Sequence, residues 1–250
     1  GLVEPSGRLL VVFSRYVMFL LLCLLAPIFV PANGYSKAFA SIRNWQILAT
    51  AGFVLALIAS KRSVVKTCAD WVMPRWVLPS VYGAGLVAFV ASSLLHFFGF
   101  RVNGIDFSTF DLMLWNTWHG RFMYSPMIAG NHFSVHLSWI MLPLVPLHAI
   151  FESPLFLTVL HAVVTWSALF PLQRLAKRYL VDDAAVVLLL IAYLTHARVG
   201  SLINHGFHFE VFYLPVGFAL LDAWTANNKR AFFCWALVFV AIKEDAGLYL

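Results

Sequence analysis

The sequence is poor in charged residues, above all in acidic ones. Only 11 of its 250 residues are Asp or Glu, charged residues make up 11% of the chain, and 62% of it is hydrophobic. A water-soluble domain needs more polar surface than this composition provides. With a mean hydropathy of +0.84, the chain is predicted to be an integral membrane protein.

Other signatures are missing too, and each absence excludes a class of site. The three cysteines lack CxxC spacing, which argues against a metal knuckle or a disulfide framework. No Rossmann or P-loop glycine pattern occurs, so a soluble nucleotide site is not predicted. The excess of basic residues, 17 against 11, is assigned to cytoplasmic loops and anionic lipid, and no nucleic-acid partner is expected.

Long apolar runs recur along the chain. A helix of about 20 apolar residues crosses the roughly 30 Å hydrocarbon core, whereas a transmembrane barrel would show alternation. We therefore predict an all-α, polytopic transmembrane helix bundle. The expected spans are Leu9–Val30, Trp45–Ser60, Val77–Phe98, Pro154–Leu172, Val181–Ala197, Phe209–Trp224 and Ala231 to the C-terminus. Because the chain starts at Gly1 and ends inside an apolar run, we expect a piece of a longer protein, truncated at its C-terminus.

The positions of Lys and Arg predict the orientation, because short cytoplasmic loops are enriched in them. We interpret Val135–Phe151, which contains two histidines and two prolines, as a re-entrant or interfacial helix that does not cross. Eleven of the 17 basic residues then lie in the cytoplasm. They are Arg8, Arg15, Lys61, Arg62, Lys66, Arg75, Arg174, Lys177, Arg178, Lys229 and Arg230.

With this orientation, three polar segments that are distant in sequence face the same non-cytoplasmic side. They are the large first loop from Arg101 to Ser134, the turn from His196 to Glu210, and the Lys243–Asp245 end of the last span. Ionisable groups next to apolar spans are costly and usually functional. The pattern therefore predicts an active site on this side, with Asp106 and Asp111 contributed by the loop.

Four motifs in order carry a resemblance to a known family. They are DFSTFDLMLWNTWHG at Asp106–Gly120, NHFSVHLSWIMLPLVPLHAIFESPL at Asn131–Leu155, HGFHFE at His205–Glu210 and KEDAGLYL at Lys243–Leu250. Together they resemble the membrane proteins grouped as domain of unknown function 2079, which are related in pattern to the GT-C class of membrane glycosyltransferases. The resemblance implies a GT-C-like core at 77–250, preceded by an extra two-helix transmembrane segment at 1–76. Ser108 and Leu112 depart from the family's usual glycine and glutamine, and His208-Phe209-Glu210 lacks the usual proline.

The resemblance implies an inverting glycosyltransferase in a bacterial plasma membrane. Such an enzyme takes a sugar from a polyprenyl-phosphate-linked donor and passes it to an acceptor on the non-cytoplasmic side. In GT-C enzymes the first large external loop carries an essential acidic residue, and here that role would fall on Asp106 or Asp111. The implied partners are membrane lipid and a lipid-linked sugar, and membership of a larger membrane complex stays open.

Glycosyl transfer needs a carboxylate that deprotonates the acceptor and a cation that stabilises the departing phosphate. We take Asp106 as the first candidate base and Asp111 as the second. Arg198, Lys243, His132 or Arg121 would contact the phosphate. The further expected substrate-binding residues are His119, Asn131, His208, Glu210, Glu244 and Asp245. The cofactor is undetermined: a divalent cation is one option, but no HExxH or DxD string is present and no metal ligand is assigned.

Structural alternatives stand beside these roles. Ser108 and Thr109 are expected to cap a helix through Asp111 to Trp118, with Asp106 facing the cavity, whereas a plain capping role would suit either aspartate. Lys243 is expected to pair with Glu244 or Asp245 if that segment is only structural. Two other functions stay open as well. A transporter or flippase would use mid-span polar residues such as His96, His161 and Asp222, and a non-catalytic membrane subunit would keep the fold alone.

Overall fold

The computed structural model describes residues 73–180 and 182–249, which are mostly helical. They belong to two compact units. Within the described ranges the first unit comprises residues 73–88 and 176–200, and the second comprises residues 89–175 and 201–249. The expected spans Leu9–Val30 and Trp45–Ser60 lie outside the described residues, as does nearly all of the expected 1–76 segment.

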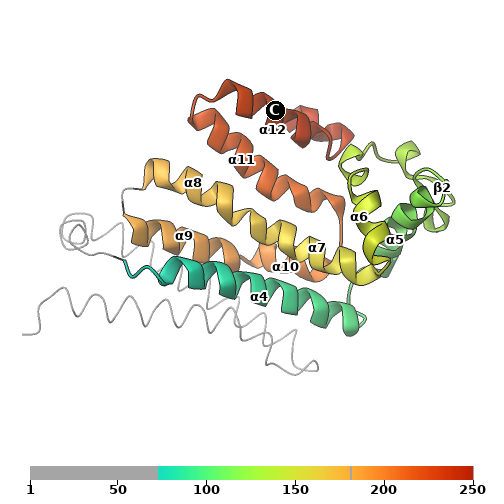
Figure 1. The fold of residues 1–250 in the computed structure, drawn as a ribbon, viewed down its shortest axis with the longest axis horizontal. Coiled ribbons are helices and arrows are strands. Elements are labelled where there is room, and N and C mark those ends of the chain that lie inside the picture. The colour runs from blue at the N-terminus through green and yellow to red at the C-terminus, as the bar shows by residue number, and fades with distance from the viewer. Residues whose placement is uncertain (1–72, 181, 250) are drawn as a thin grey trace, which may run out of the picture. The chain divides into compact units, whose positions relative to one another are not determined.

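The helices follow one another with short connections (Figure 1). The α-helices are α4 (Val77–Phe98), α5 (Gly104–Trp118), α6 (Leu144–Phe151), α7 (Pro154–Ser167), α8 (Leu169–Tyr179), α9 (Asp183–Thr195), α10 (Ala197–His205), α11 (Tyr213–Thr225) and α12 (Lys229–Val240). The short 3₁₀ turns are η2 (Pro126–Ile128), η3 (His132–Ser134), η4 (Trp139–Met141), η5 (Phe209–Phe212) and η6 (Glu244–Tyr249). Strands β1 (Tyr124–Ser125) and β2 (Gly130–Asn131) pair antiparallel, with Tyr124 opposite Asn131.

Two described helical stretches are long and apolar enough to cross a membrane. The first, α4, has the predicted bounds, and the second consists of α7 and α8 together, Pro154–Tyr179. Helices α9 and α10 make a third candidate if they count as one span, although they are bent by 44°. The turn predicted from His196 to Glu210 therefore consists largely of a helix.

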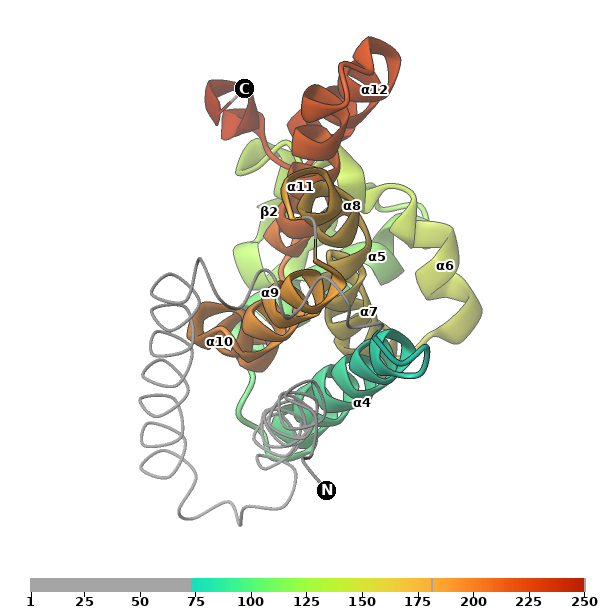
Figure 2. The ribbon, with the colours of Figure 1, turned by 90° about the vertical axis from the view of Figure 1, so that its left-hand side faces the viewer.

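The predictions for the last two spans need correction. Helix α11 begins at Tyr213, after the η5 turn, and α12 ends at Val240 instead of continuing to the C-terminus. The two helices pack side by side (Figure 1 and Figure 2). With 13 and 12 residues, each is about 20 Å long or less, which is shorter than the roughly 30 Å hydrocarbon core.

Local sequence explains several helix boundaries. Ser153 accepts a hydrogen bond from the Leu155 amide and stands before Pro154, a pairing that favours the start of α7. Asn228 caps α12 by accepting from the Ala231 amide. Helix α5 begins at Gly104 with Asn103 at its N-cap position, so the predicted caps Ser108 and Thr109 lie inside the helix and Asp106 lies in its first turn.

The first unit holds a close helix contact. In α4, Gly85 lies against α9, where an added Cβ would come within 2.8 Å of a Leu194 methyl group. A basic residue near the end of α8, Lys177, lies 3.8 Å from Asp183 at the start of α9. These contacts join the segments of this unit that the structure describes.

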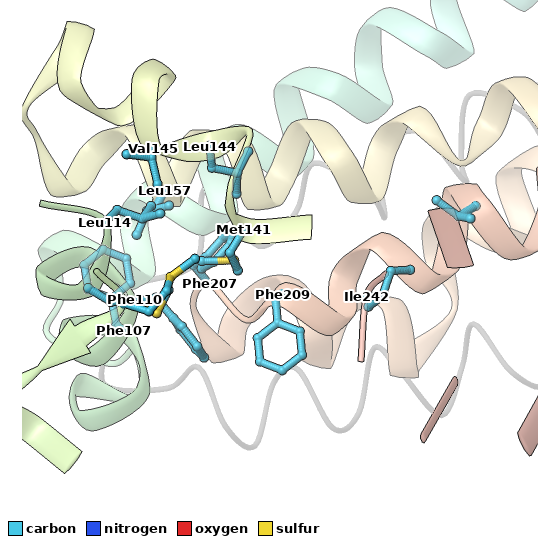
Figure 3. Close-up of a cluster of buried hydrophobic side chains, with 13 residues drawn as sticks. Phe107, Phe110, Leu114, Met141, Leu144, Val145, Leu157, Phe207, Phe209 and Ile242 are labelled. Carbon is cyan, nitrogen blue, oxygen red and sulfur yellow. The ribbon is translucent and has the colours of Figure 1, made fainter. Parts of the chain in front are cut away.

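The second unit has a buried hydrophobic cluster that joins the segments carrying the polar residues of interest. Helix α5 contributes Phe107, Phe110 and Leu114, and the Phe207–Phe209 turn contributes two fully buried rings (Figure 3). Met141, Leu144, Val145, Leu157 and Ile242 complete the labelled part of the cluster. This core holds α5, α6 and the turns around α11 and α12 in a fixed arrangement.

Candidate functional site

Polar side chains from three distant segments meet in the second unit. Lys243 Nζ, after α12, donates to Glu210 Oε1 in η5 at 2.7 Å. The next residue, Glu244, contacts the segment after β2: its Oε1 accepts from His136 Nδ1 at 2.9 Å, and its Oε2 accepts from the Leu137 amide at 2.9 Å. The sequence predicted that these segments would face one side, and the structure brings their side chains into direct contact.

Two further contacts extend this polar cluster. His208 Nδ1 lies 2.9 Å from Glu210 Oε2, an ion-pair distance without hydrogen-bond alignment. The Tyr213 hydroxyl donates to Asp245 Oδ1 at 3.4 Å, a long hydrogen bond. The alternative pairing of Lys243 with Glu244 or Asp245 is not seen, because the close partner of Lys243 is Glu210.

These contacts fix the charges in the cluster. The neighbouring His208, and then the Lys243 ammonium, lower the pKa of Glu210 to about 2. A hydrogen bond from His136 lowers the pKa of Glu244 to about 2, and the carboxylate of Glu210 raises the pKa of Lys243. Glu210 and Glu244 are therefore ionised at neutral pH, and the positive charge of Lys243 is largely balanced by its partner.

His132 is a buried residue beside the polar cluster. Its Nε2 hydrogen-bonds the Ser138 hydroxyl at 2.8 Å, and its ring packs edge-on against Phe110 and Phe209. Burial, with the nearby His136 adding to it, lowers the pKa of His132 to about 4. The rings of His132 and His136 lie with their centroids 5.9 Å apart, in a segment that is not an α-helix. Within the described residues, no group of three or more His, Cys, Asp or Glu side chains has a geometry that could hold a metal ion.

Asp111 lies in a different environment, in the wall of an apolar cavity. Its Oδ1 accepts a hydrogen bond from His148 Nε2, on α6, at 2.9 Å, and the His148 side chain is almost fully buried. The cavity has a volume of about 500 Å³. Its apolar walls include Phe97, Phe98, Val102, Phe107, Leu112 and Pro154. A carboxylate is thus held by an imidazole at the edge of a space suited to an apolar ligand.

Asp106, the first candidate base, has a local partner. Its Oδ2 accepts from Asn103 Nδ2 at 2.6 Å, and it lies in the first turn of α5, where a carboxylate is favoured by the helix dipole. Because Asp106 and Asp111 have separate partners, the structure does not join them into a carboxylate pair. A catalytic role for Asp106 stays a prediction.

Four other predicted residues lie outside the polar cluster. The ring of His119 stacks on Trp115 at 3.9 Å, and its Nδ1 is bonded to the Trp115 carbonyl. Asn131 uses both polar atoms of its side chain inside the β1–β2 hairpin, and Arg121 is exposed beside that hairpin. Arg198 is exposed on α10 in the first unit.

The mid-span polar residues that would serve a transporter each have a structural partner. His96 Nδ1 contacts the Ser92 carbonyl at 2.9 Å, and His161 Nε2 donates to the Leu202 carbonyl at 3.0 Å. Asp222 accepts from Arg174 Nε at 2.9 Å. Each of the three residues thus has a local partner, although His161 Nδ1 is buried without a hydrogen bond within the described residues. The local contacts give the transporter hypothesis no specific support.

Comparison with known proteins identifies the family of this chain. A family of predicted membrane proteins, DUF2079, matches residues 97–250, which is more than half of the chain. The chain belongs to the DUF2079 family. No curated protein and no solved structure matches it. The matched range includes Asp111, His148 and the whole polar cluster, so the DUF2079 core contains both parts of the candidate site.

Sequence reasoning missed two partners in this DUF2079 core. Neither His136 nor His148 is among the predicted site residues, yet each pairs with a carboxylate. The available signal was a histidine in an apolar segment, which needs a partner when it is buried. The identity of the partner depends on tertiary contacts over 37 residues for His148 and over 108 for His136.

Proposed function

We propose that this DUF2079 protein is a membrane glycosyltransferase that transfers a sugar from a polyprenyl-phosphate-linked donor to an acceptor on the non-cytoplasmic side. The observation that carries the proposal is the Asp111–His148 pair beside the apolar cavity. The apolar walls of the cavity can bind the isoprenoid chain of the donor. The carboxylate of Asp111 can take the proton of the acceptor hydroxyl.

In this mechanism Asp111 is the general base. Its Oδ1 is occupied by His148, while no hydrogen bond within the described residues engages its Oδ2. As the acceptor oxygen attacks the anomeric carbon, its proton passes to Asp111 and the sugar–phosphate bond breaks. His148 is a positioning residue that keeps the carboxylate oriented toward the cavity.

The polar cluster has a supporting part in this proposal. Phe110, next to Asp111 in sequence, packs against His132, His208 and Phe209. These ring contacts connect the polar cluster to helix α5, which carries Asp111. Lys243 and Arg121 are the proposed contacts for the departing phosphate, and a divalent cation is the alternative.

The test measures transfer of radiolabelled sugar from a panel of polyprenyl phosphate sugars. Membranes contain the full-length protein or the Asp111→Asn, Asp106→Asn or Glu152→Gln variant at matched levels. We expect Asp111→Asn to lower transfer about 100-fold or more, because it removes a general base. Asp106→Asn should lower it less than about tenfold, and the exposed Glu152→Gln control should match the wild type.

Two results would reject parts of this proposal. Full activity of Asp111→Asn together with loss of activity in Asp106→Asn would identify Asp106, in the first turn of α5, as the general base. Absence of transfer by the wild type from every donor would reject the glycosyltransferase function and favour a non-catalytic subunit.

A further inference from the structure

The β1–β2 hairpin and its neighbours expose a large apolar surface. Six side chains each expose between 44% and 56% of their area: Trp115, Trp118, Phe122, Met127, Val135 and Trp139. We call these six residues the hairpin surface. Three of them are tryptophans, and proteins in water rarely leave so many large apolar groups uncovered in one segment.

Ring contacts connect the two edges of the hairpin within this surface. The ring of Phe133 lies 5.0 Å from Trp139 and 5.5 Å from Phe122, centroid to centroid. Phe122 precedes β1 and Trp139 begins η4, so the ring of Phe133 links the two sides of the hairpin. Two of the six exposed groups, Phe122 and Trp139, are therefore connected through the ring of Phe133.

The surface rests on an ordered hydrogen-bonded frame. Asn131 Nδ2 donates to the Phe122 carbonyl at 2.9 Å, and Asn131 Oδ1 accepts from the Phe133 amide at 2.8 Å. Asn116 on α5 donates to the Tyr124 carbonyl at 3.2 Å, which ties the hairpin to that helix. The exposed rings are thus held in place on the protein.

The charge pattern of this region points to lipid as the occupant. From Leu112 to Phe151 the chain has no Asp or Glu, and Arg121 is its only Lys or Arg. An exposed loop in water or a polar protein interface would carry charges of both signs. Tryptophans with a lone arginine match the membrane–water interface, where indole rings sit at headgroup level and cations meet lipid phosphates.

Helix α5, which leads to this region, begins shortly after α4, a helix long and apolar enough to cross a membrane. After α4 ends at Phe98, the Gly99 amide bonds back to the Leu95 carbonyl and the Arg101 amide to the His96 carbonyl. Three residues later, α5 begins at Gly104. Phe100, in this turn, is 95% exposed. Helix α5 therefore starts six residues after the end of α4, where a crossing helix would meet the headgroup region.

From these observations we propose that the hairpin surface lies in the headgroup region of the bilayer and binds lipid, which makes residues 115–139 an interfacial membrane-binding element. The region predicted as a large external loop is then a membrane-bound structure. The cavity beside Asp111 is consequently held at the bilayer surface, where any lipid-linked molecule presents its polar head. This inference does not depend on the proposed glycosyl transfer.

Site-directed spin labelling of the full-length protein in lipid nanodiscs tests the inference. Single-cysteine variants Phe122→Cys and Met127→Cys are made in a background where Cys23, Cys68 and Cys234 are serine. Both sites are exposed, so labelling leaves the core intact. The reference is Glu152→Cys, an exposed charged position where a left-handed residue other than glycine is already tolerated.

We expect labels at Phe122 and Met127 to be relaxed by oxygen, and to show several-fold lower accessibility to a water-soluble nickel complex than the label at Glu152. Equal nickel accessibility at all three sites would mean that the surface faces water and would overturn the inference. Exclusion of both oxygen and nickel would mean that protein covers it, which also overturns the inference.

Discussion

At the scale of single residues, the environment of each carboxylate separates the two candidate bases. Asp106 accepts a hydrogen bond from an amide three residues away, which is typical of a helix start. Asp111 is bound by a histidine from another helix at the edge of a cavity. A buried imidazole that orients a carboxylate costs desolvation, and proteins usually retain such pairs where chemistry or binding uses them.

The buried His132 predicts an acid-sensitive stability. Its pKa is about 4 in the folded protein against 6.5 in the unfolded chain, so between these pH values the unfolded chain binds a proton that the folded state does not. Folding stability should therefore fall by up to about 3 kcal/mol as the pH drops from 6.5 to 4. Melting temperatures in nanodiscs across this range measure the effect.

A variant isolates this contribution. His132→Phe keeps a ring against Phe110 and Phe209 but cannot titrate, so its melting temperature should be lower overall and should change less between pH 6.5 and 4. The exposed His119→Phe variant should retain the pH dependence of the wild type. The carboxylates of Glu210 and Glu244 lose their stabilising charge only below about pH 4.5, so the change in stability between pH 6.5 and 4.5 reports on His132 without them. An unchanged slope in His132→Phe would contradict the assignment.

The residues of the polar cluster were partly predictable. Glu210, Lys243 and Glu244 were selected because charges beside apolar spans are costly, and the charge asymmetry of the loops placed them on one side. The sequence could not show that Lys243 contacts Glu210 and that Glu244 contacts His136, because those pairs depend on how the turns before α11 and after α12 fold together.

At the scale of elements, the turn between α10 and η5 requires glycine at position 206. Gly206 has φ = +98°, and an added Cβ would lie 3.1 Å from the Val102 Cβ. The same turn is bonded to the start of α5 by the Asn103 amide, which donates to the His205 carbonyl at 2.9 Å. A side chain at Gly206 would disturb the backbone and this contact together.

Gly206→Ala should therefore destabilise the protein by about 1–3 kcal/mol, through left-handed strain and crowding at Val102. Thermal unfolding in nanodiscs is the measurement. Gly104→Ala is the matched control, because its added methyl meets no atom within 4 Å, and its effect should stay within about 0.5 kcal/mol. Equal melting temperatures for the two variants would show that the turn tolerates a side chain.

Apolar runs predicted where helices occur better than where they end. The bounds of α4 were predicted correctly because the run is flanked by a tryptophan and a glycine. The run from Ala231 continues through Val240 and Ala241 without any polar residue, so hydropathy alone could not predict the turn that ends α12. That turn is set by packing, since Ile242 is fully buried and the Ala241 carbonyl accepts from the Ile140 amide.

At the scale of the whole molecule, membership of the DUF2079 family and two apolar helices of sufficient length make this a membrane protein. The orientation of the chain in the membrane stays a prediction from basic residues. The stretch Pro154–Tyr179 offers a direct test, because Glu152 precedes it on the side of the proposed site and Lys177 lies in its last turn among basic residues.

We predict that Glu152 and Lys177 lie on opposite sides of the membrane, with Lys177 in the cytoplasm, because a stretch of 26 helical residues is about 39 Å long and exceeds the hydrocarbon core. Single-cysteine variants Glu152→Cys and Lys177→Cys, each in the serine background, are treated with a membrane-impermeant maleimide. In right-side-out vesicles Glu152→Cys should react and Lys177→Cys should not, and inside-out vesicles should reverse this result. Reaction of both from one side would mean that the chain turns back between α7 and α8, and the proposed site would then lose its assignment to the non-cytoplasmic side.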